Sequence, residues 1–548
     1  MEDGIAAPSA EADMLDVTAA AARSGWHRQI RERWWRLPTA LPLLAVLGVQ
    51  AALSARLFKA NTAFQDEAIY LWAGHLDLAN LLHGRPVPPF AAYFSGAPVL
   101  YPPLGAIADN LGGLAGARAL SMVFMLGATA LVWGTTSQLF GRRAAFFAAA
   151  LFATLGPTLH LGAFATYDAP AVFLVALACW CVVRAGDRSD ATAWMVVAGI
   201  VLALANATAY STTLFDPVVI IVALLSSMPR PGGRLAANRA LIMLTVVLVL
   251  LGVGLLIGGS YYQAGVRLTT LNRVPGGTSF ITVLQDAGLW TGLVVLLAVI
   301  GVIISLLGRE GGVRIWMLAI LTLAAVVGPF EQAHLHTAAS LNKHVGLGAW
   351  FAAIAAGYAL DKLISAAALG ITQTVTCGAC VVALVFPLAV GAQQSRTFST
   401  DWPNASTFIA ILRPLVNYGS GRLLVEDPSI AEYYLTKAGS QWQRWSSTRN
   451  IYKPGGVSTG GPSKSAGVVG PGNLWEFTKY IRKGYFATVA LNFADTTTLD
   501  HKLGRELKRN PNYCIVRVVP YGFGPDGTTP GTYVIWQYRA NQANCRGR

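Results

Sequence analysis

Long apolar segments recur along this chain, and they limit its fold more than any other feature. Most are close to the roughly 20 residues with which a helix crosses a membrane, and several are near the lower limit. Only 12% of the residues are charged, which is about half the share usual in soluble proteins. The sequence therefore predicts a polytopic α-helical membrane protein with about eleven transmembrane helices. The segments lie at 40–58, 117–138, 143–162, 169–184, 192–209, 213–228, 239–260, 287–307, 315–330, 346–360 and 374–392.

The basic residues predict how these helices are oriented. With the N-terminus inside, the inner segments are short and basic, and the longer outer loops hold about half as many Lys and Arg. The N-terminus is then cytoplasmic, and an odd number of spans puts the C-terminus outside. This arrangement accounts for the formal net charge of +14 without a nucleic acid partner. The inner basic residues are Arg23 to Arg36, Arg142, Arg143, Arg184, Arg188, Arg230, Arg234, Arg239, Arg309, Arg314 and Lys362.

The composition divides the chain into three regions. Residues 1–38 are polar and predict a cytoplasmic tail, and 39–394 form the transmembrane region, with a long outer loop at 59–116. Residues 395–548 contain short β-like runs that alternate with helical stretches, which predicts an extracytoplasmic α/β domain. Its β-like runs are Arg422–Glu426, Phe486–Phe493, Tyr513–Val519 and Thr532–Tyr538, and its helical stretches are 404–416, 427–436 and 496–509. The Ala/Gly-rich composition, with more Arg than Lys, suggests a bacterial plasma membrane protein.

The cysteines fit this division. Cys514 and Cys545 are the two cysteines of the last region, where an exported compartment permits a disulfide between them. Cys377 and Cys380 have the spacing of half a zinc site, but no second pair follows, and cysteines inside apolar spans are usually small buried hydrophobes.

Two adjacent carboxylates, Asp66 and Glu67, follow the first apolar segment. A carboxylate at the membrane–water boundary can take a proton from a hydroxyl when its environment orients it. The alternative is structural, because acidic residues also favour the start of a helix. Asp168, in the second outer turn after Tyr167, has the same two interpretations: a metal or acceptor contact, or a helix cap before Pro170.

Cationic residues gather on the same outer side. Lys343 and His344 precede an apolar helix and suit a phosphate, although snorkelling to lipid headgroups is the alternative. His334 and His336 have the spacing of metal ligands on an extended strand. Arg267 and Arg273 add positive charge in another outer loop. One face of the membrane thus carries a base for an attacking hydroxyl and cations for a leaving phosphate, as a reaction on a lipid phosphate needs.

Several of these motifs, in this order, resemble those of the GT-C glycosyltransferases. The similarity is strongest to the polyprenyl-phosphate-dependent branch that includes protein O-mannosyltransferases and the bacterial lipid A aminoarabinose transferase. It covers residues 40 to about 390 in topology, and most specifically 60–185. The matching motifs are Asp66-Glu67, Tyr101-Pro102-Pro103-Leu104, Phe140 to Ala145, Thr166 to Pro170 and Ser340 to His344.

The resemblance implies an enzyme that moves a sugar, with inversion, from a polyprenyl-phosphate donor to an extracytoplasmic glycan, lipid or protein. It implies Asp66 as general base, Glu67 as its assistant, and Asp168 with Tyr167 as positioning groups for the acceptor or a metal. Relatives of the aminoarabinose transferase type have a Lys where this chain has Tyr101. The donor phosphate is therefore assigned to Lys343, His344 and Arg267 together with Tyr101.

The resemblance leaves the cofactor open. A divalent cation, Mg²⁺ or Mn²⁺, remains a candidate cofactor, and its candidate ligands are Asp66, Asp168 and His334. We expect membrane lipids and an acceptor of the cell envelope as the other partners.

Two other functions compete with this interpretation. A transporter or flippase of a lipid-linked sugar would also be polytopic, but it needs polar residues along a path, whereas here the ionisable residues gather on one face. A receptor would bind a polysaccharide with its outer domain, for which the stretch Trp442–Trp445 offers aromatic rings. We expect the outer domain to lie over the face that carries Asp66 and to guide the acceptor.

Overall fold

The computed structural model describes residues 40–538, except 187, 189, 229–232, 274, 368–370, 418–420, 437–441, 449–450, 453–467, 470–473 and 525–526. The predicted cytoplasmic tail 1–38 and Cys545 lie outside the described residues. Cys514 is disulfide-bonded.

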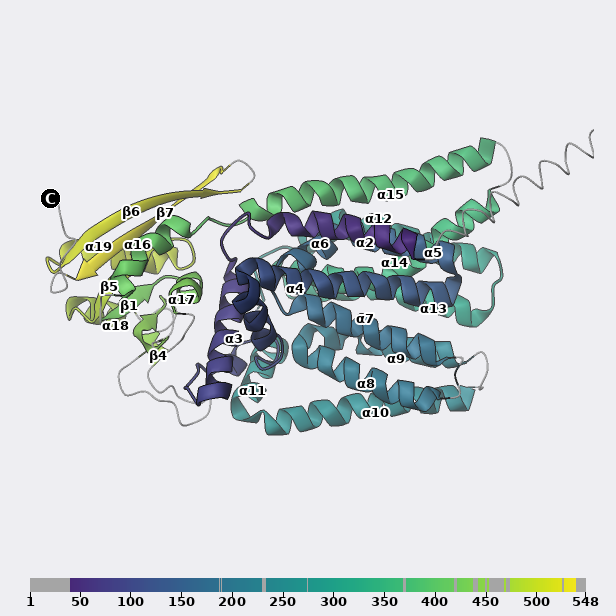
Figure 1. Cartoon of the computed structure of the whole chain (residues 1–548), viewed down its shortest axis with the longest axis horizontal. Coiled ribbons are helices and arrows are strands. Elements are labelled where there is room, and N and C mark those ends of the chain that lie inside the picture. The colour runs from purple at the N-terminus through teal and green to yellow at the C-terminus, as the bar shows by residue number, and fades with distance from the viewer. Residues whose placement is uncertain are drawn as a thin grey trace, which may run out of the picture.

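The first part of the chain is a bundle of long helices, as predicted (Figure 1). By length and composition, nine helices of the described residues can cross a membrane, or ten if the bent pair α5–α6 counts as one span. The first predicted span is the shorter helix Leu41–Leu57, whose last turn is the 3₁₀ turn at Ala55–Leu57. The helices are α2 (Leu41–Ser54), α3 (Gln65–His83), α4 (Tyr101–Phe140), α5 (Arg142–Thr154), α6 (Gly156–Ala163), α7 (Asp168–Ala185), α8 (Ala191–Thr208), α9 (Asp216–Ser227), α10 (Gly233–Ile257), α11 (Gly259–Val266), α12 (Phe280–Leu307), α13 (Gly312–His334), α14 (Leu341–Ala366) and α15 (Ile371–Thr397).

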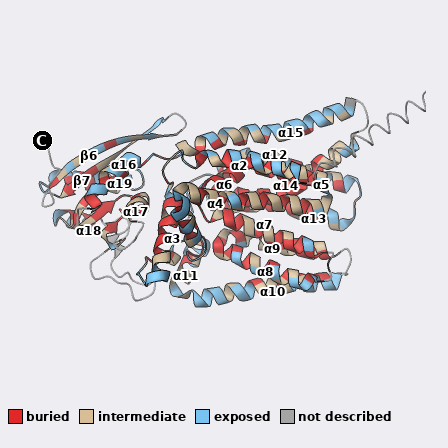
Figure 2. Cartoon of the chain, viewed as in Figure 1, coloured by how far each residue is buried: buried red, intermediate tan, exposed pale blue. Residues whose placement is uncertain are grey.

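Burial separates the central helices of the bundle from its outer ones. Figure 2 shows α7 as mostly buried and α10 and α15 as largely exposed. The exposed side chains of the outer helices are apolar, for example Leu248, Leu256 and Val382. A long helix whose apolar side chains face outward is expected where lipid covers it.

The second part of the chain is a small α/β domain, as predicted. Its sheet has the order β2-β1-β5-β7-β6, with β1 parallel to β2 and β5, and with β7 antiparallel to β5 and β6. Its elements are α16 (Ser406–Asn417), β1 (Arg422–Val425), α17 (Ser429–Leu435), β2 (Trp445–Ser446), β3 (Ile451–Tyr452), β4 (Val468–Val469), α18 (Leu474–Arg482), β5 (Phe486–Leu491), α19 (Thr497–Arg509), β6 (Tyr513–Phe523) and β7 (Thr529–Tyr538).

Helices cover both faces of this sheet. Successive residues of a strand point to opposite faces, so Leu423 packs with α16 while Leu424 packs with α18 and α19. The strands pair in register, for example Leu424 with Val489. The sequence analysis found the principal strands but not α18.

Helix α3 joins the two parts. It lies across the end of the bundle, between the long helices and the sheet domain (Figure 1). On the domain side, Trp72 Nε1 donates to Thr436 Oγ1 at 3.1 Å, and Tyr433 Oη donates to Asp109 Oδ1 of α4 at 2.8 Å. The backbone N–H of Ala63 also donates to Tyr434 Oη at 2.8 Å. The domain is therefore fixed beside the first turn of α3, which carries Asp66.

Candidate active site

Asp66, Asp168 and Lys343 meet although they are far apart in the sequence. The Lys343 Nζ atom lies 2.6 Å from Asp66 Oδ2 and 3.3 Å from Asp168 Oδ2. The three residues come from the first turns of α3, α7 and α14, so these helix starts converge at one end of the bundle. Asp66 is the most accessible of the three, with 31% of its side chain exposed against 9% for Lys343.

The start of α3 separates the two neighbouring carboxylates. Glu67 closes a capping box, in which the N–H of Phe64 donates to Glu67 Oε2 at 2.9 Å. Adjacent residues of a helix point about 100° apart, so Asp66 faces a cavity while Glu67 faces the interior. The capping interpretation is therefore right for Glu67, whereas Asp66 faces Lys343.

Glu67 is fully buried against Arg118. Arg118 donates from Nε to Oε1 at 2.8 Å and from Nη2 to Oε2 at 2.7 Å, and neither side chain is exposed. The N–H of Ala165 also donates to Glu67 Oε1, and Arg118 donates to the carbonyl of Leu57. This ion pair ties α3 to α4 and to the second outer turn. Sequence reasoning missed Arg118, although an ionisable residue inside an apolar run is a signal for a special role.

A cavity of about 580 Å³ opens beside the pair of Asp66 and Lys343. Of the residues predicted from the sequence, it is lined by Asp66, Tyr167, Asp168, His334, Lys343 and His344; its other polar lining residues are Tyr70, Ser95, Tyr210, Ser211, Thr213, Thr269, Thr270, Asn272, Arg273, Glu331 and Ser340.

Two phenols line the cavity next to the carboxylates. The rings of Tyr70 and Tyr167 have centroids 4.6 Å apart. Burial raises the pKa of Tyr167 to about 12, and the charge of Asp168 adds to this effect. Burial likewise raises the pKa of Tyr70 well above its usual value. Both hydroxyls therefore keep their protons at neutral pH, and because they share one hydrogen bond with each other, one O–H group remains to donate to a ligand.

Arg273 and His344 line the cavity near Glu331. Arg273 Nη1 lies 3.7 Å from Glu331 Oε1, and His344 Nδ1 lies 3.8 Å from Glu331 Oε2. His344 Nδ1 also lies 2.5 Å from Gln332 Nε2. His334 is exposed at the end of α13.

The structure places two of the predicted phosphate-binding residues away from this cavity. Arg267 is exposed and begins a π-helical turn, in which Leu268 to Thr270, but not Arg267, line the cavity. Tyr101 is 1% exposed, and its hydroxyl lies 3.4 Å from Ser121 Oγ. Arg273, which the sequence analysis gave only as general positive charge, lines the cavity instead.

The candidate metal ligands do not form a complete site. Among the described residues, no group of three or more His, Cys, Asp and Glu side chains is arranged to hold a metal ion. The Lys343 ammonium bridges Asp66 and Asp168, where a cation between the two carboxylates would lie. These residues do not fit a metal in this arrangement, and we derive no chemical step through one.

Comparison with known proteins confirms the predicted resemblance to GT-C glycosyltransferases. Residues 106–256 match the family model of dolichyl-phosphate-mannose-protein mannosyltransferases. The apo structure of ArnT from Cupriavidus metallidurans matches with a TM-score of 0.58 at 15% identity, over 94% of this chain and 98% of that one. No curated protein sequence matches the chain.

Two complexes with lipid phosphates have the same fold. ArnT from Cupriavidus metallidurans bound to undecaprenyl phosphate matches with a TM-score of 0.55 at 15% identity, over 90% of this chain and 97% of that one. The archaeal oligosaccharyltransferase AglB from Archaeoglobus fulgidus, in complex with an inhibitory peptide and a dolichol-phosphate, matches with a TM-score of 0.55 at 16% identity, over 94% of this chain and 75% of that one. At these identities the likeness establishes the fold.

Proposed function

We propose that this protein is a membrane glycosyltransferase that transfers a sugar from a polyprenyl-phosphate donor to a hydroxyl of an extracytoplasmic acceptor, with inversion. The observation that carries the proposal is the convergence of Asp66, Asp168 and Lys343 on one polar cavity. The family matched by residues 106–256 is described by a dolichyl-phosphate-mannose donor, and two proteins of the same fold have been captured with polyprenyl phosphates.

Asp66 is placed to act as the general base. Its carboxylate is the most accessible charge of the site and can accept the proton of an acceptor hydroxyl. The hydroxyl oxygen then attacks the anomeric carbon, and the bond from that carbon to the phosphate oxygen breaks on the opposite side. The electron pair of that bond leaves with the phosphate, and the proton passes from Asp66 to solvent. Attack from the side opposite the leaving group gives inversion.

Lys343 has two roles in this proposal. Before the donor binds, its ammonium forms an ion pair with Asp66 at 2.6 Å. When the lipid phosphate enters the cavity, the same ammonium can turn toward the phosphate and stabilise the charge that develops on it. Asp66 then loses its ion pair with Lys343 when the donor is bound, and its carboxylate can accept the proton of the acceptor hydroxyl. Arg273 and His344, which also line the cavity, supply further donors for the phosphate.

The remaining predicted residues hold this arrangement in place. Asp168 contacts Lys343 Nζ at 3.3 Å and limits where the ammonium can move. Glu67 acts through Arg118 and the backbone before Asp66, so we assign it a positioning role. Tyr167 donates a hydrogen bond to the sugar or the acceptor.

We also propose that the outer domain guides the acceptor. A cavity of about 360 Å³ lies between α3 and this domain, lined by Gln65 and Trp72 on one side and by Asp427 and Trp445 on the other. Tyr93, which also lines this cavity, is exposed, and its ring with the nearby carboxylates suits the faces and hydroxyls of sugars. Gln65 lines this cavity and directly precedes Asp66, so the cavity lies beside the first turn of the helix that carries the proposed base.

A transfer assay with radiolabelled polyprenyl-phosphate sugars, in liposomes that contain the full chain, tests the function. We expect one donor to be consumed by the wild type and not by Asp66→Asn. Asp77→Asn is the matched control, because Asp77 lies on the same helix, outside the lining of this cavity. If labelled lipid crosses the bilayer without transfer, and Asp66→Asn stops that movement, the protein is a flippase and the proposal is wrong.

A further inference from the structure

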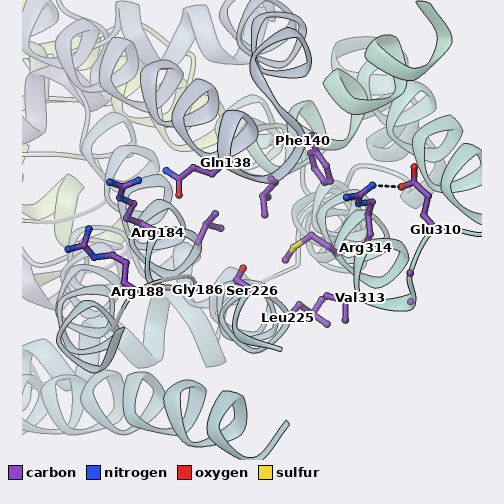
Figure 3. Close-up of a pocket in the computed structure, with 15 residues that line it drawn as sticks. Gln138, Phe140, Arg184, Gly186, Arg188, Leu225, Ser226, Glu310, Val313 and Arg314 are labelled. Carbon is purple, nitrogen blue, oxygen red and sulfur yellow. Dashed lines mark hydrogen bonds and ion pairs between the residues drawn. The ribbon is translucent and has the colours of Figure 1, made fainter. Parts of the chain in front are cut away.

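A second large cavity lies at the other end of the bundle from Asp66. It has a volume of about 760 Å³ and lies between the last turns of α4, α7 and α9 and the first turn of α13 (Figure 3). Helix α7 begins at Asp168 in the candidate active site and ends at Ala185 beside this cavity. Its 18 residues span roughly 27 Å, close to the thickness of a hydrocarbon core. The two cavities therefore lie at opposite boundaries of the membrane.

Arginines dominate the charge of this second cavity. Arg184 and Arg188 lie on one side, and Arg314 lies across from them (Figure 3). Glu310 is the one acidic residue of the lining, and it already accepts from Lys362 Nζ at 2.7 Å and Tyr358 Oη at 2.8 Å. Since the charge of Lys362 offsets that of Glu310, the arginines give the cavity a net positive charge.

Two of the arginines retain donors for a ligand. Arg314 contributes Nη1 to Glu310 at 3.0 Å and keeps its other N–H groups. Arg184 is exposed, and among the described residues it makes no ion pair or hydrogen bond. Arg188 pairs with Asp190 through two bonds, which leaves it a weaker donor.

Neutral donors point to an anion at the same place. Ser226 Oγ is buried and, in the described part of the chain, has no hydrogen-bond partner, although buried hydroxyls nearly always have one. Helix α13 begins at Gly312 without a capping side chain, so the positive end of its dipole favours an anion beside its first turn. Apolar side chains, Phe140, Leu225 and Met317, form the rest of the wall.

We propose that this cavity binds the phosphate headgroup of an anionic membrane lipid. Arg184, Arg314 and Ser226 would hold the phosphate oxygens, and the apolar wall would receive the first carbons of the acyl chains. Basic pockets between membrane helices bind lipid headgroups by this combination of charge and apolar surface. The basic residues around the cavity also favour the cytoplasmic leaflet for this face. A soluble phosphate compound could use the same donors, but it would leave the apolar wall uncovered.

Lipid titration of the purified full chain in detergent, followed by native mass spectrometry, tests this proposal. The probes are phosphatidylglycerol, phosphatidylcholine and inorganic phosphate. We expect tight binding of phosphatidylglycerol alone, and binding that is at least about tenfold weaker in the double variant Arg184→Gln, Arg314→Gln. Arg142→Gln is the matched control, because Arg142 is an exposed arginine of the same end that does not line the cavity.

The other outcomes decide whether the cavity binds a lipid phosphate, a soluble phosphate or neither. Equal binding of phosphatidylglycerol to the double variant and the control would overturn the site. Binding of inorganic phosphate that displaces the lipid would show a site for a soluble phosphate and overturn the lipid assignment. If the double variant does not fold, Ser226→Phe tests the same cavity by filling it, and unchanged lipid binding in that variant would also overturn the proposal. Because this site lies away from Asp66, its failure would leave the proposed sugar transfer untouched.

Discussion

Lys343 and Asp66, 277 positions apart, form an ion pair of 2.6 Å at the mouth of a polar cavity. The pair places an ammonium beside the proposed base, in the lining of the cavity that a lipid phosphate would enter. In the proposed reaction Lys343 pairs first with Asp66 and then with the donor phosphate. Donor binding thereby releases Asp66 to accept the proton of the acceptor hydroxyl.

Replacing Lys343 tests this link. Lys343→Gln should lower kcat for sugar transfer by about 10²–10³-fold, the loss typical of removing one group that stabilises developing charge. Lys362→Gln is the control, since Lys362 pairs with Glu310 at the other end of the bundle. Single-turnover rates with donor in excess separate the chemical step from binding. Equal rates in the two variants would contradict the role of Lys343.

Arg273 and Arg267 offer a matched comparison of two cations of the same outer loop. Arg273 lines the cavity and Arg267 does not. We expect Arg273→Gln to raise the KM for the donor roughly tenfold, the worth of one charge-assisted phosphate contact, and Arg267→Gln to change it little. Initial rates over a range of donor concentrations give both values. If Arg267→Gln raised the KM for the donor more than Arg273→Gln, the phosphate would lie outside this cavity.

The buried pair of Glu67 and Arg118 should matter for stability. Removing one partner leaves an uncompensated buried charge, so Arg118→Met should cost about 3–5 kcal/mol. The double variant Glu67→Leu, Arg118→Met should be less destabilised than the single variant, because no charge then remains buried. Thermal unfolding in detergent measures the difference. Arg482→Gln, at an exposed pair with Glu506, should shift the midpoint little.

The contact between Tyr433 and Asp109 should affect the acceptor rather than the donor. Tyr433→Phe removes the hydroxyl that donates to Asp109 at 2.8 Å, a bond worth about 1–3 kcal/mol to a charged acceptor. The outer domain is then held less firmly on α4. We expect the KM for the acceptor to rise several-fold while the KM for the donor stays constant. Tyr480→Phe, on α18 of the same domain, serves as control, and a parallel rise in both KM values would argue against a role in acceptor binding.

The outer domain should also lose stability as the pH rises. Burial and the nearby Glu426 charge raise the pKa of Asp500 to about 8, whereas an unfolded Asp has a pKa of about 3.9. Between these values the folded state holds the extra proton, so the free energy of unfolding falls with increasing pH. Asp500→Asn should flatten this dependence, which thermal unfolding of the full chain between pH 5 and pH 8 will measure. If the stability of the Asp500→Asn variant depended on pH as strongly as that of the wild type, groups other than Asp500 would cause the dependence.

Much of the architecture could be predicted from the sequence, because length and periodicity carry it. Apolar runs of membrane length predicted the helical bundle, and short β-like runs between helical stretches predicted the strands that begin at Arg422, Phe486 and Tyr513. These patterns are local, so they do not depend on what packs against them. The first predicted span, 40–58, agrees within one residue at each end with the apolar helix Leu41–Leu57, whose last turn is the 3₁₀ turn Ala55–Leu57.

The sequence by itself also determined which residue types gather on the outer face, but only the tertiary structure decided what each of them contacts. Asp66 and Glu67 are neighbours of equal charge, yet the capping box and Arg118 turn one inward and leave the other facing the cavity. Arg273 lines the cavity, whereas Arg267, which begins a π-helical turn, does not. Side-chain direction at a helix start depends on caps and on packing partners distant in the chain, and no local pattern records those partners.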